Sequence, residues 1–252
     1  MRKNLIPLVI LPSLLIACSI NGSKASLAKS FESFVTGSNR ILEADIQSVS
    51  RKISMDAGFA IYISEKGCSG CEAFNPILTS YVEKTSLLTY KFDVEDNRED
   101  LAAFQLFYGD KFFKKNDAGN YVIKTPSLYV VQNNVVDEID YESYMKADKA
   151  FENYMNSKYD IKNHYYIHES ISNYDMSGKS FTYVCYDKGK EELVNLYKAK
   201  LLPLINQSDK TIIVSDENSE ELLSISKYEN GSLVETKNIT SETSEEELKQ
   251  MI

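Results

Sequence analysis

The stretch Phe59-Ala-Ile-Tyr-Ile-Ser-Glu-Lys-Gly-Cys68-Ser-Gly-Cys71-Glu-Ala-Phe-Asn-Pro76 decides the fold of this 252-residue chain. Its apolar start, Phe59 to Ile63, predicts a short buried strand. From Cys71 onward the apolar residues recur at helical spacing, at Phe74, Ile77, Leu78, Tyr81 and Val82. A loop therefore connects a strand to a helix, and two cysteines three positions apart lie at the first turn of that helix.

This position has chemical consequences for the first cysteine. The unpaired amide donors and the positive end of a helix stabilise an anion by roughly 0.3 to 2 kcal/mol, which lowers a thiol pKa by up to roughly 1.5. Because the thiolate is the nucleophile, Cys68 is predicted to react first. Cys71 lies one turn further on, close enough to close a small disulfide, which suits a resolving thiol. Ser69 and Gly70 keep the active-site loop small and unobstructed.

The cysteine pair also admits two other interpretations. Structural zinc uses this spacing, but it normally needs two such pairs or additional histidines, and the remaining cysteines, Cys18 and Cys185, form no second pair. A purely structural disulfide is the second alternative, although so short a loop contributes little chain entropy to stability. Redox exchange is the favoured interpretation. It requires no metal and no cofactor other than the Cys68–Cys71 disulfide itself.

A second motif follows at Lys124-Thr125-Pro126-Ser127, where a proline immediately precedes an apolar strand. Because proline cannot donate to a central ladder, at a strand entrance it marks an edge or a special backbone position. A turn at residues 132–134 then leads to a return strand over residues 135–139. With Pro76 placed five residues after Cys71, these motifs occur in an order that resembles the thioredoxin family, over about residues 39–158.

The resemblance implies an α/β thioredoxin-like fold, in which helices flank a central mixed sheet. It implies a cis peptide bond before Pro126, packed against the active-site disulfide. Thr125 and Pro126 would then bind an extended substrate chain, while Cys68 and Cys71 exchange disulfides with it. A narrower resemblance is to accessory thioredoxin-like proteins of low-GC Gram-positive bacteria, some of them tied to bacteriocin export.

Two positions depart from the family pattern. Gly67, in the active-site loop, stands where many thioredoxins carry a tryptophan, and this chain has no tryptophan. Tyr62 stands six residues before Cys68, where thioredoxins carry a buried acid that accepts a proton. Glu65 and Glu72 flank the loop and are candidate substitutes for that acid, or else are solvated surface charges.

The N-terminus predicts export and lipid anchoring. Arg2 and Lys3 precede an apolar run, Leu5 to Ala17, of the length of a signal peptide core. The run ends in Leu15-Ile16-Ala17-Cys18, which resembles the lipobox of bacterial lipoproteins and implies cleavage before Cys18 and acylation of that residue. A plain secretory signal with an incidental cysteine is the alternative. We therefore expect an extracytoplasmic protein held at the cell membrane, where paired cysteines oxidise readily.

The charge of the chain limits its partners. A formal net charge of −9 at pH 7 argues against nucleic acid and against electrostatic binding to anionic lipid. The expected partners are exported proteins with thiols or disulfides, together with a membrane partner that recycles the cysteine pair. The leading function is a membrane-anchored thiol–disulfide oxidoreductase of unknown direction. The alternative is a non-enzymatic thioredoxin-fold lipoprotein that serves as a binding or accessory protein in peptide export.

The chain is long enough for two domains. The predicted segments are a signal peptide at residues 1–17, a lipidated cysteine and tether at 18–38, the redox domain at 39–160, a linker at 161–177 and a second domain at 178–252. The second domain is expected to be a degenerate thioredoxin-like repeat, or an unrelated small α/β module, without redox chemistry. We expect His164 and His168 to be an exposed pair in the linker, and Cys185 to be a small buried hydrophobic residue.

Overall fold

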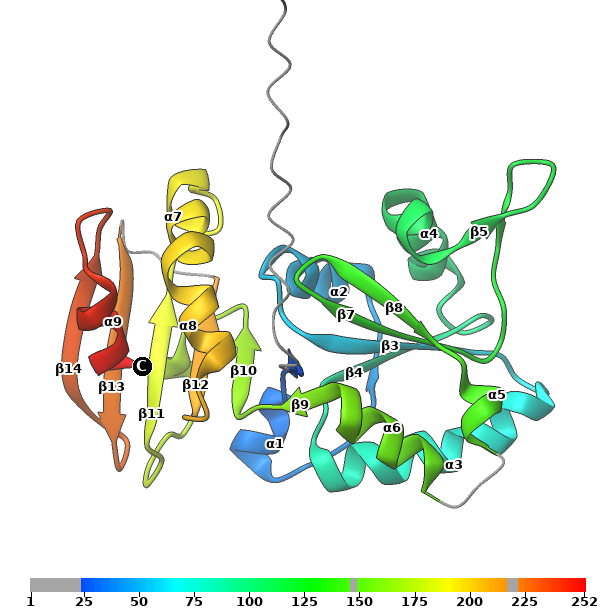
Figure 1. Ribbon diagram of the computed structural model, residues 1–252, viewed down its shortest axis with the longest axis horizontal. Helices are drawn as coiled ribbons and strands as arrows, with labels where there is room; N and C mark the ends of the chain where they lie inside the picture. Colours follow the sequence, from blue (N-terminus) through cyan, green and yellow to red (C-terminus); the bar gives the residue numbers. More distant parts are fainter. Residues whose placement is uncertain (1–23, 146–148, 217–221) are drawn as a thin grey trace, which may run out of the picture.

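The computed structural model describes residues 24–145, 149–216 and 222–252, which form two α/β units, each built on its own five-stranded sheet (Figure 1). The predicted signal peptide and Cys18 lie outside the described residues. None of the described helices is both long and apolar enough to cross a membrane.

The first sheet has the strand order β2-β4-β3-β7-β8. Its strands are β2 (Leu42–Glu43), β4 (Thr89–Asp93), β3 (Phe59–Ser64), β7 (Ser127–Gln132) and β8 (Val135–Ile139). Strands β2, β4 and β3 run parallel, whereas β7 and β8 are antiparallel to their neighbours. This mixed sheet, flanked by helices on both faces, is the thioredoxin-like fold that the sequence predicts.

The central strand β3 is buried on both faces, which explains its continuous apolar run. Phe59, Ile61 and Ile63 face the layer of α2 (Ile46–Ser54) and α4 (Arg98–Phe112). Ala60 and Tyr62 face the layer of α3 (Ser69–Thr85) and α6 (Ala150–Lys158). The short helix α5 (Tyr141–Tyr144) follows β8 and leads toward α6.

The second sheet repeats the topology of the first, with the order β10-β12-β11-β13-β14. Its strands are β10 (His164–Ile167), β12 (Ile212–Ser215), β11 (Phe181–Cys185), β13 (Leu223–Glu229) and β14 (Ser232–Ile239). The first three are parallel and the last two antiparallel, as in the first sheet. The second unit is therefore a reduced thioredoxin-like repeat, and Cys185 on β11 is buried, as predicted.

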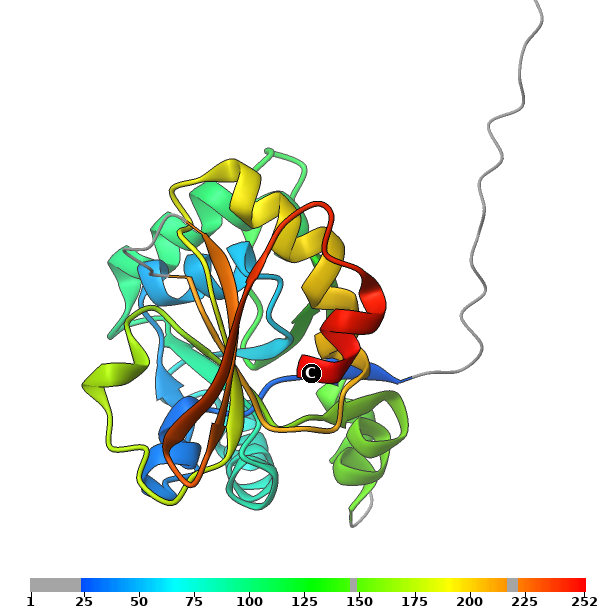
Figure 2. The same cartoon turned by 90° about the vertical axis from the view of Figure 1, so that its left-hand side faces the viewer.

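The α- and π-helices of the second unit cover one face of its sheet. They are α7 (Glu191–Leu196), the π-helical segment η2 (Tyr197–Leu201), α8 (Leu202–Gln207) and α9 (Glu245–Met251). Figure 2 shows them together on one side of the twisted β13–β14 hairpin. Helix α9 follows its N-cap residue Ser244, which forms a reciprocal capping box with Glu247.

The predicted tether and linker need revision, because both contain structure that packs on the two units. Strand β1 (Ala25–Leu27) pairs in parallel with β9 (Tyr159–Ile161), and β10 belongs to the second sheet. Helix α1 (Phe31–Thr36) packs its aromatic rings on the opposite face of that sheet, with Phe34 lying 4.9 Å from Tyr165 between ring centroids. The N-terminal segment therefore supplies aromatic cover for a face of the reduced repeat.

The prediction that His164 and His168 form an exposed pair is wrong. His164 lies on β10 and is buried, with its Nε2 3.0 Å from the carbonyl oxygen of Ser208. Burial lowers its pKa to about 4. His168 follows the end of the same strand and is mostly buried. The sequence does not reveal this strand, because β10 is short and its histidine and tyrosine residues are also typical of a polar linker.

An extra hairpin precedes the proline loop. Strands β5 (Lys114–Lys115) and β6 (Tyr121–Val122) pair around a turn at residues 116–120, beside α4 (Figure 1). A Cβ atom at Gly109 would lie 2.5 Å from the ring of Tyr121, so only glycine allows the hairpin to approach α4 so closely. The hairpin therefore packs closely on this helix.

Candidate active site

The cysteine pair lies at the start of helix α3, after the loop that follows strand β3. Cys68 is the N-cap of α3, and the backbone N–H of Cys71 donates to the Sγ atom of Cys68 over 3.2 Å. The backbone N–H of Glu72 donates to the carbonyl oxygen of Cys68 over 3.0 Å. The sulfur of Cys68 thus occupies the place of a capping acceptor at the positive end of the helix, where negative charge is stabilised.

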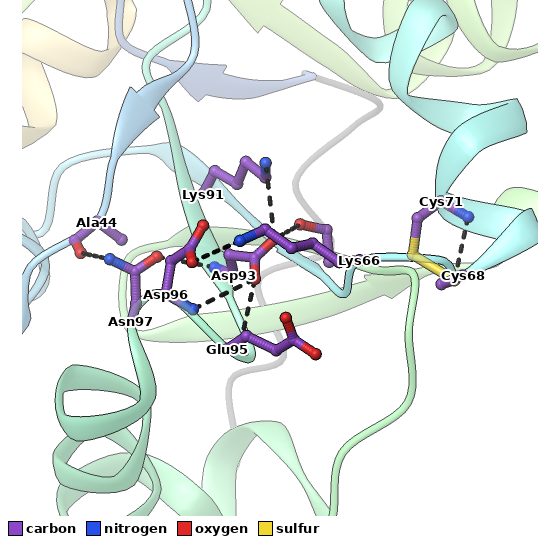
Figure 3. Close-up of polar contacts among 10 residues, drawn as sticks. Ala44, Lys66, Cys68, Cys71, Lys91, Asp93, Glu95, Asp96 and Asn97 are labelled. Carbon is purple, nitrogen blue, oxygen red and sulfur yellow. Dashed lines mark hydrogen bonds and ion pairs between the residues drawn. A yellow bond between two sulfur atoms is a disulfide. The ribbon is translucent and has the colours of Figure 1, made fainter.

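Cys68 and Cys71 form a disulfide, with their Cα atoms 5.2 Å apart (Figure 3). The two sulfurs differ in access. Cys68 is partly exposed, whereas Cys71 is only 5% exposed and is covered by the helix. An external thiol or disulfide can therefore reach Cys68 more readily than Cys71.

The loop of Thr125 and Pro126 packs directly on the cysteine loop. The peptide bond between these two residues is cis, as the family resemblance implies. A Cβ atom added to Gly70 would lie 2.9 Å from the Cδ of Pro126 and 3.3 Å from the hydroxyl of Tyr141. The structure thus brings together the two motifs that the sequence analysis singled out, and the glycine permits their contact.

A hydrogen bond also ties the two loops together. The hydroxyl of Thr125 donates to the carboxylate of Glu65 over 3.0 Å, across strands β3 and β7. Glu65 itself is exposed, as is Glu72 in the first turn of α3. Both carboxylates therefore border the site from the solvent side.

A hollow of about 660 Å³ opens beside the disulfide. It is lined by the loop Gly67–Gly70, by Thr125, and by three residues that follow β8, namely Tyr141, Glu142 and Met145. Sequence reasoning missed these last three residues, because the return strand that carries them to the site gives no local sign of where it ends. The sign in the sequence that could have placed them at the site is that they follow the return strand, which pairs with β7.

Tyr62 occupies the position of the buried family acid. Its side chain is fully buried, and its hydroxyl has no hydrogen-bond partner among the described residues. Burial, with contributions from Tyr141 and Asp93, raises its pKa to about 12. Tyr62 is therefore neutral near pH 7, and it places no negative charge behind the cysteine loop.

Asp93 is a buried acid, but its carboxylate has a structural role. Its carboxylate accepts hydrogen bonds from the Ser64 hydroxyl (3.3 Å) and from the backbone N–H groups of Glu95 (3.1 Å) and Asp96 (3.4 Å). Figure 3 shows this network to one side of the disulfide. Asp93 thus stabilises the turn between β4 and α4. Within the described parts of the chain, no group of histidine, cysteine and acidic residues is arranged to hold a metal ion.

No protein-family model and no curated protein sequence matches the chain. Among solved structures, human ERp44 (form I) aligns with 84% of this chain and 55% of its own length, at 10% identity and a TM-score of 0.34. This chain thus spans about half of ERp44. A mutant thioredoxin from Halobacterium salinarum NRC-1 aligns with 49% of this chain and 94% of its own length, at 17% identity and a TM-score of 0.34. Oxidised thioredoxin O2 from Arabidopsis thaliana aligns with 48% and 96%, at 16% identity and a TM-score of 0.34.

The strand order of the first unit and the closely spaced disulfide at the start of α3 are those of a thioredoxin-like fold. This combination supports thiol–disulfide exchange as its general chemistry.

Proposed function

We propose that this protein is a membrane-anchored, extracytoplasmic thiol–disulfide oxidoreductase that acts on exported proteins. The observation that carries the proposal is the partly exposed sulfur of Cys68, which caps α3, is bonded to the buried Cys71 and lies in the loop packed against Pro126. A helix N-terminus favours the thiolate, and the thiolate is the reactive form.

The reaction uses both cysteines in turn. In the reductive direction the Cys68 thiolate attacks one sulfur of a substrate disulfide, that bond breaks, and a substrate thiolate leaves. The Cys71 thiolate then attacks the Sγ atom of Cys68 and releases the second substrate thiolate. The protein ends with the Cys68–Cys71 disulfide, and the substrate has gained two electrons. The two substrate thiolates take up two protons when the pH lies below their pKa. The reverse sequence oxidises a substrate dithiol.

The direction depends on the stability of the reduced pair relative to the substrate. Reduction potentials in this chemistry range from about −270 mV to about −120 mV. A membrane redox partner would restore the cysteine pair after each cycle. Residues 1–17 would direct export, and acylation of Cys18 would hold the protein at the membrane.

A trapping experiment tests the exchange reaction. The substitution Cys71→Ala removes the resolving thiol, so mixed disulfides between Cys68 and substrates should accumulate in cells and disappear on reduction. The double variant Cys68→Ala/Cys71→Ala is the control and should trap nothing. Absence of any mixed disulfide with Cys71→Ala, together with full function of Cys68→Ser, would favour the alternative of a non-enzymatic binding lipoprotein.

A fractionation experiment tests the anchor. The full-length chain should appear in the membrane fraction and incorporate labelled palmitate, whereas Cys18→Ser should do neither. Membrane retention of Cys18→Ser without label would contradict lipid anchoring at this residue. The exchange activity of the soluble variant, measured with a small disulfide, separates this result from a failure to fold.

A further inference from the structure

Two adjoining hollows lead from the disulfide across the proline loop, and together we call them the groove. The hollow beside the cysteines and a second hollow next to it share three lining residues, Thr125, Tyr141 and Glu142. The second hollow continues along Lys124 to Ser127 and ends at Glu138 to Asp140, where β8 leads into α5. A polypeptide that reaches Cys68 in an extended form would pass along this groove.

Carboxylates border the far part of the groove. Glu138, Asp140 and Glu142 are all exposed, and Lys124 is the single basic residue that lines the same hollow. Hydroxyl groups contact two of the acids: Ser143 donates to Asp140 over 2.5 Å, and Tyr141 donates to Glu142 over 3.4 Å. A hydroxyl does not neutralise a carboxylate. Within residues 24–145, 149–216 and 222–252, none of the three acids has an ion-pair partner.

Two further acidic residues flank the cysteine loop in sequence, outside the lining of the two hollows. Glu65 and Glu72 are exposed on either side of the cysteine loop. Lys66 lies between them in sequence, but its ammonium pairs with the carboxylate of Asp96 at 2.7 Å. Of the charged residues that line the two hollows, three are acidic and one, Lys124, is basic, so negative charge predominates in the groove.

We propose that this groove selects extended, basic segments of polypeptide that carry the reacting cysteine, a substrate class that rests on the proposed oxidoreductase function. A cleft lined by charges of one sign raises the association rate of oppositely charged partners by about 10-fold to 1000-fold, and this effect falls steeply with salt. The ring of Tyr141, half-buried between the two hollows, gives the segment an apolar surface against which to lie. Lysine or arginine residues flanking the substrate cysteine would face Glu138, Asp140 and Glu142.

The test uses the reduced protein and three peptides of one length, each with a central cysteine joined to thionitrobenzoate and flanked by lysine, serine or glutamate. The Cys68 thiolate attacks the peptide sulfur, thionitrobenzoate leaves as its coloured thiolate, and Cys71 then releases the peptide thiol. At low salt the lysine peptide should react at least about tenfold faster than the glutamate peptide, and this ratio should approach one in concentrated NaCl.

Two charge-matched variants locate the effect. The groove variant Glu138→Gln/Asp140→Asn/Glu142→Gln should lose most of the lysine-to-glutamate ratio. The control Glu229→Gln/Glu235→Gln/Glu242→Gln removes the same charge from exposed positions of the second unit and should keep the ratio. If the triple groove variant does not fold, Glu142→Gln alone should lower the ratio, because Glu142 lines both hollows.

Equal rates for the lysine and glutamate peptides at low salt would overturn the proposal, as would a groove variant with the same ratio as the unmodified protein. A failure of the oxidoreductase function itself looks different. In that case even the serine peptide would release no peptide thiol, whereas loss of selectivity alone leaves the serine peptide reactive.

Discussion

The side-chain nitrogen of Lys52 lies 2.8 Å from Nε2 of His168, although the two residues are 116 positions apart and belong to different units. Lys52 also donates to the carbonyl oxygen of Tyr166 over 2.8 Å, and Nδ1 of His168 lies 2.9 Å from the carboxylate of Asp216. Lys52 and Asp216 are buried. A chain of polar groups thus crosses the contact between α2 of the first unit and the ends of β10 and β12 of the second.

This polar chain predicts a pH dependence of stability. Burial, with a smaller contribution from Arg51, lowers the pKa of Lys52 to about 7, although Asp216 and Asp45 act in the opposite direction. The unfolded chain therefore holds this proton more tightly than the folded protein does. Between about pH 7 and pH 9, the free energy of unfolding should gain up to about 1.4 kcal/mol per pH unit from this residue.

Urea unfolding of Lys52→Met at pH 7, 8 and 9 checks the prediction. The slope of unfolding free energy against pH should be smaller in this variant than in the unmodified protein. Lys210→Met, at an exposed lysine, is the control and should keep the original slope. Parallel profiles for all three proteins would show that Lys52 does not change protonation on unfolding.

Tyr62 predicts a substitution that stabilises the protein. Its buried hydroxyl has no partner among the described residues, so Tyr62→Phe removes a desolvated polar group and keeps the ring contact with Phe74. The free energy of unfolding should rise by about 1 kcal/mol. Tyr81→Phe is the matched control, since the hydroxyl of Tyr81 donates to Asn156 over 3.0 Å and its loss should destabilise by about 1 kcal/mol. Destabilisation by Tyr62→Phe would mean that this hydroxyl has a partner.

Gly70 predicts a local constraint at the active site. A Cβ atom at this position would overlap the Pro126 ring, so Gly70→Ala must push the cysteine and proline loops apart. We expect a loss of about 1 to 3 kcal/mol of stability, as for other overpacked sites. Ser69→Ala, at the neighbouring exposed position, should change stability by less than about 0.5 kcal/mol. Thermal unfolding of both variants in the oxidised form measures the difference, and equal melting temperatures would contradict it.

Local pattern was sufficient to predict the fold of the first unit. The apolar run before Cys68, the helical spacing after Cys71 and the proline before β7 are each visible within about a dozen residues. What the pattern could not show is pairing over long distances. Lys29 donates to Asn163 over 2.8 Å across 134 positions, and β1 pairs with β9 through strands too short to show any periodicity. Tyr141 and Glu142 were missed at the site for the same reason, because tertiary pairing alone brings them to the disulfide.

The revised role of the N-terminal segment gives the last prediction. The ring of Phe34 in α1 lies 4.9 Å from that of Tyr165 and 6.1 Å from that of Phe181, and the ammonium of Lys179 lies 4.6 Å from its centroid. Phe34→Ala should therefore lower the free energy of unfolding by about 2 to 3 kcal/mol, somewhat less than for a fully buried ring. Phe107→Ala, at a ring that is 69% exposed on α4, is the control and should have an effect below about 0.5 kcal/mol. Urea unfolding of both variants distinguishes a packed N-terminal segment from a flexible tether. If the segment were only a tether, the Phe34→Ala and Phe107→Ala variants would be equally stable.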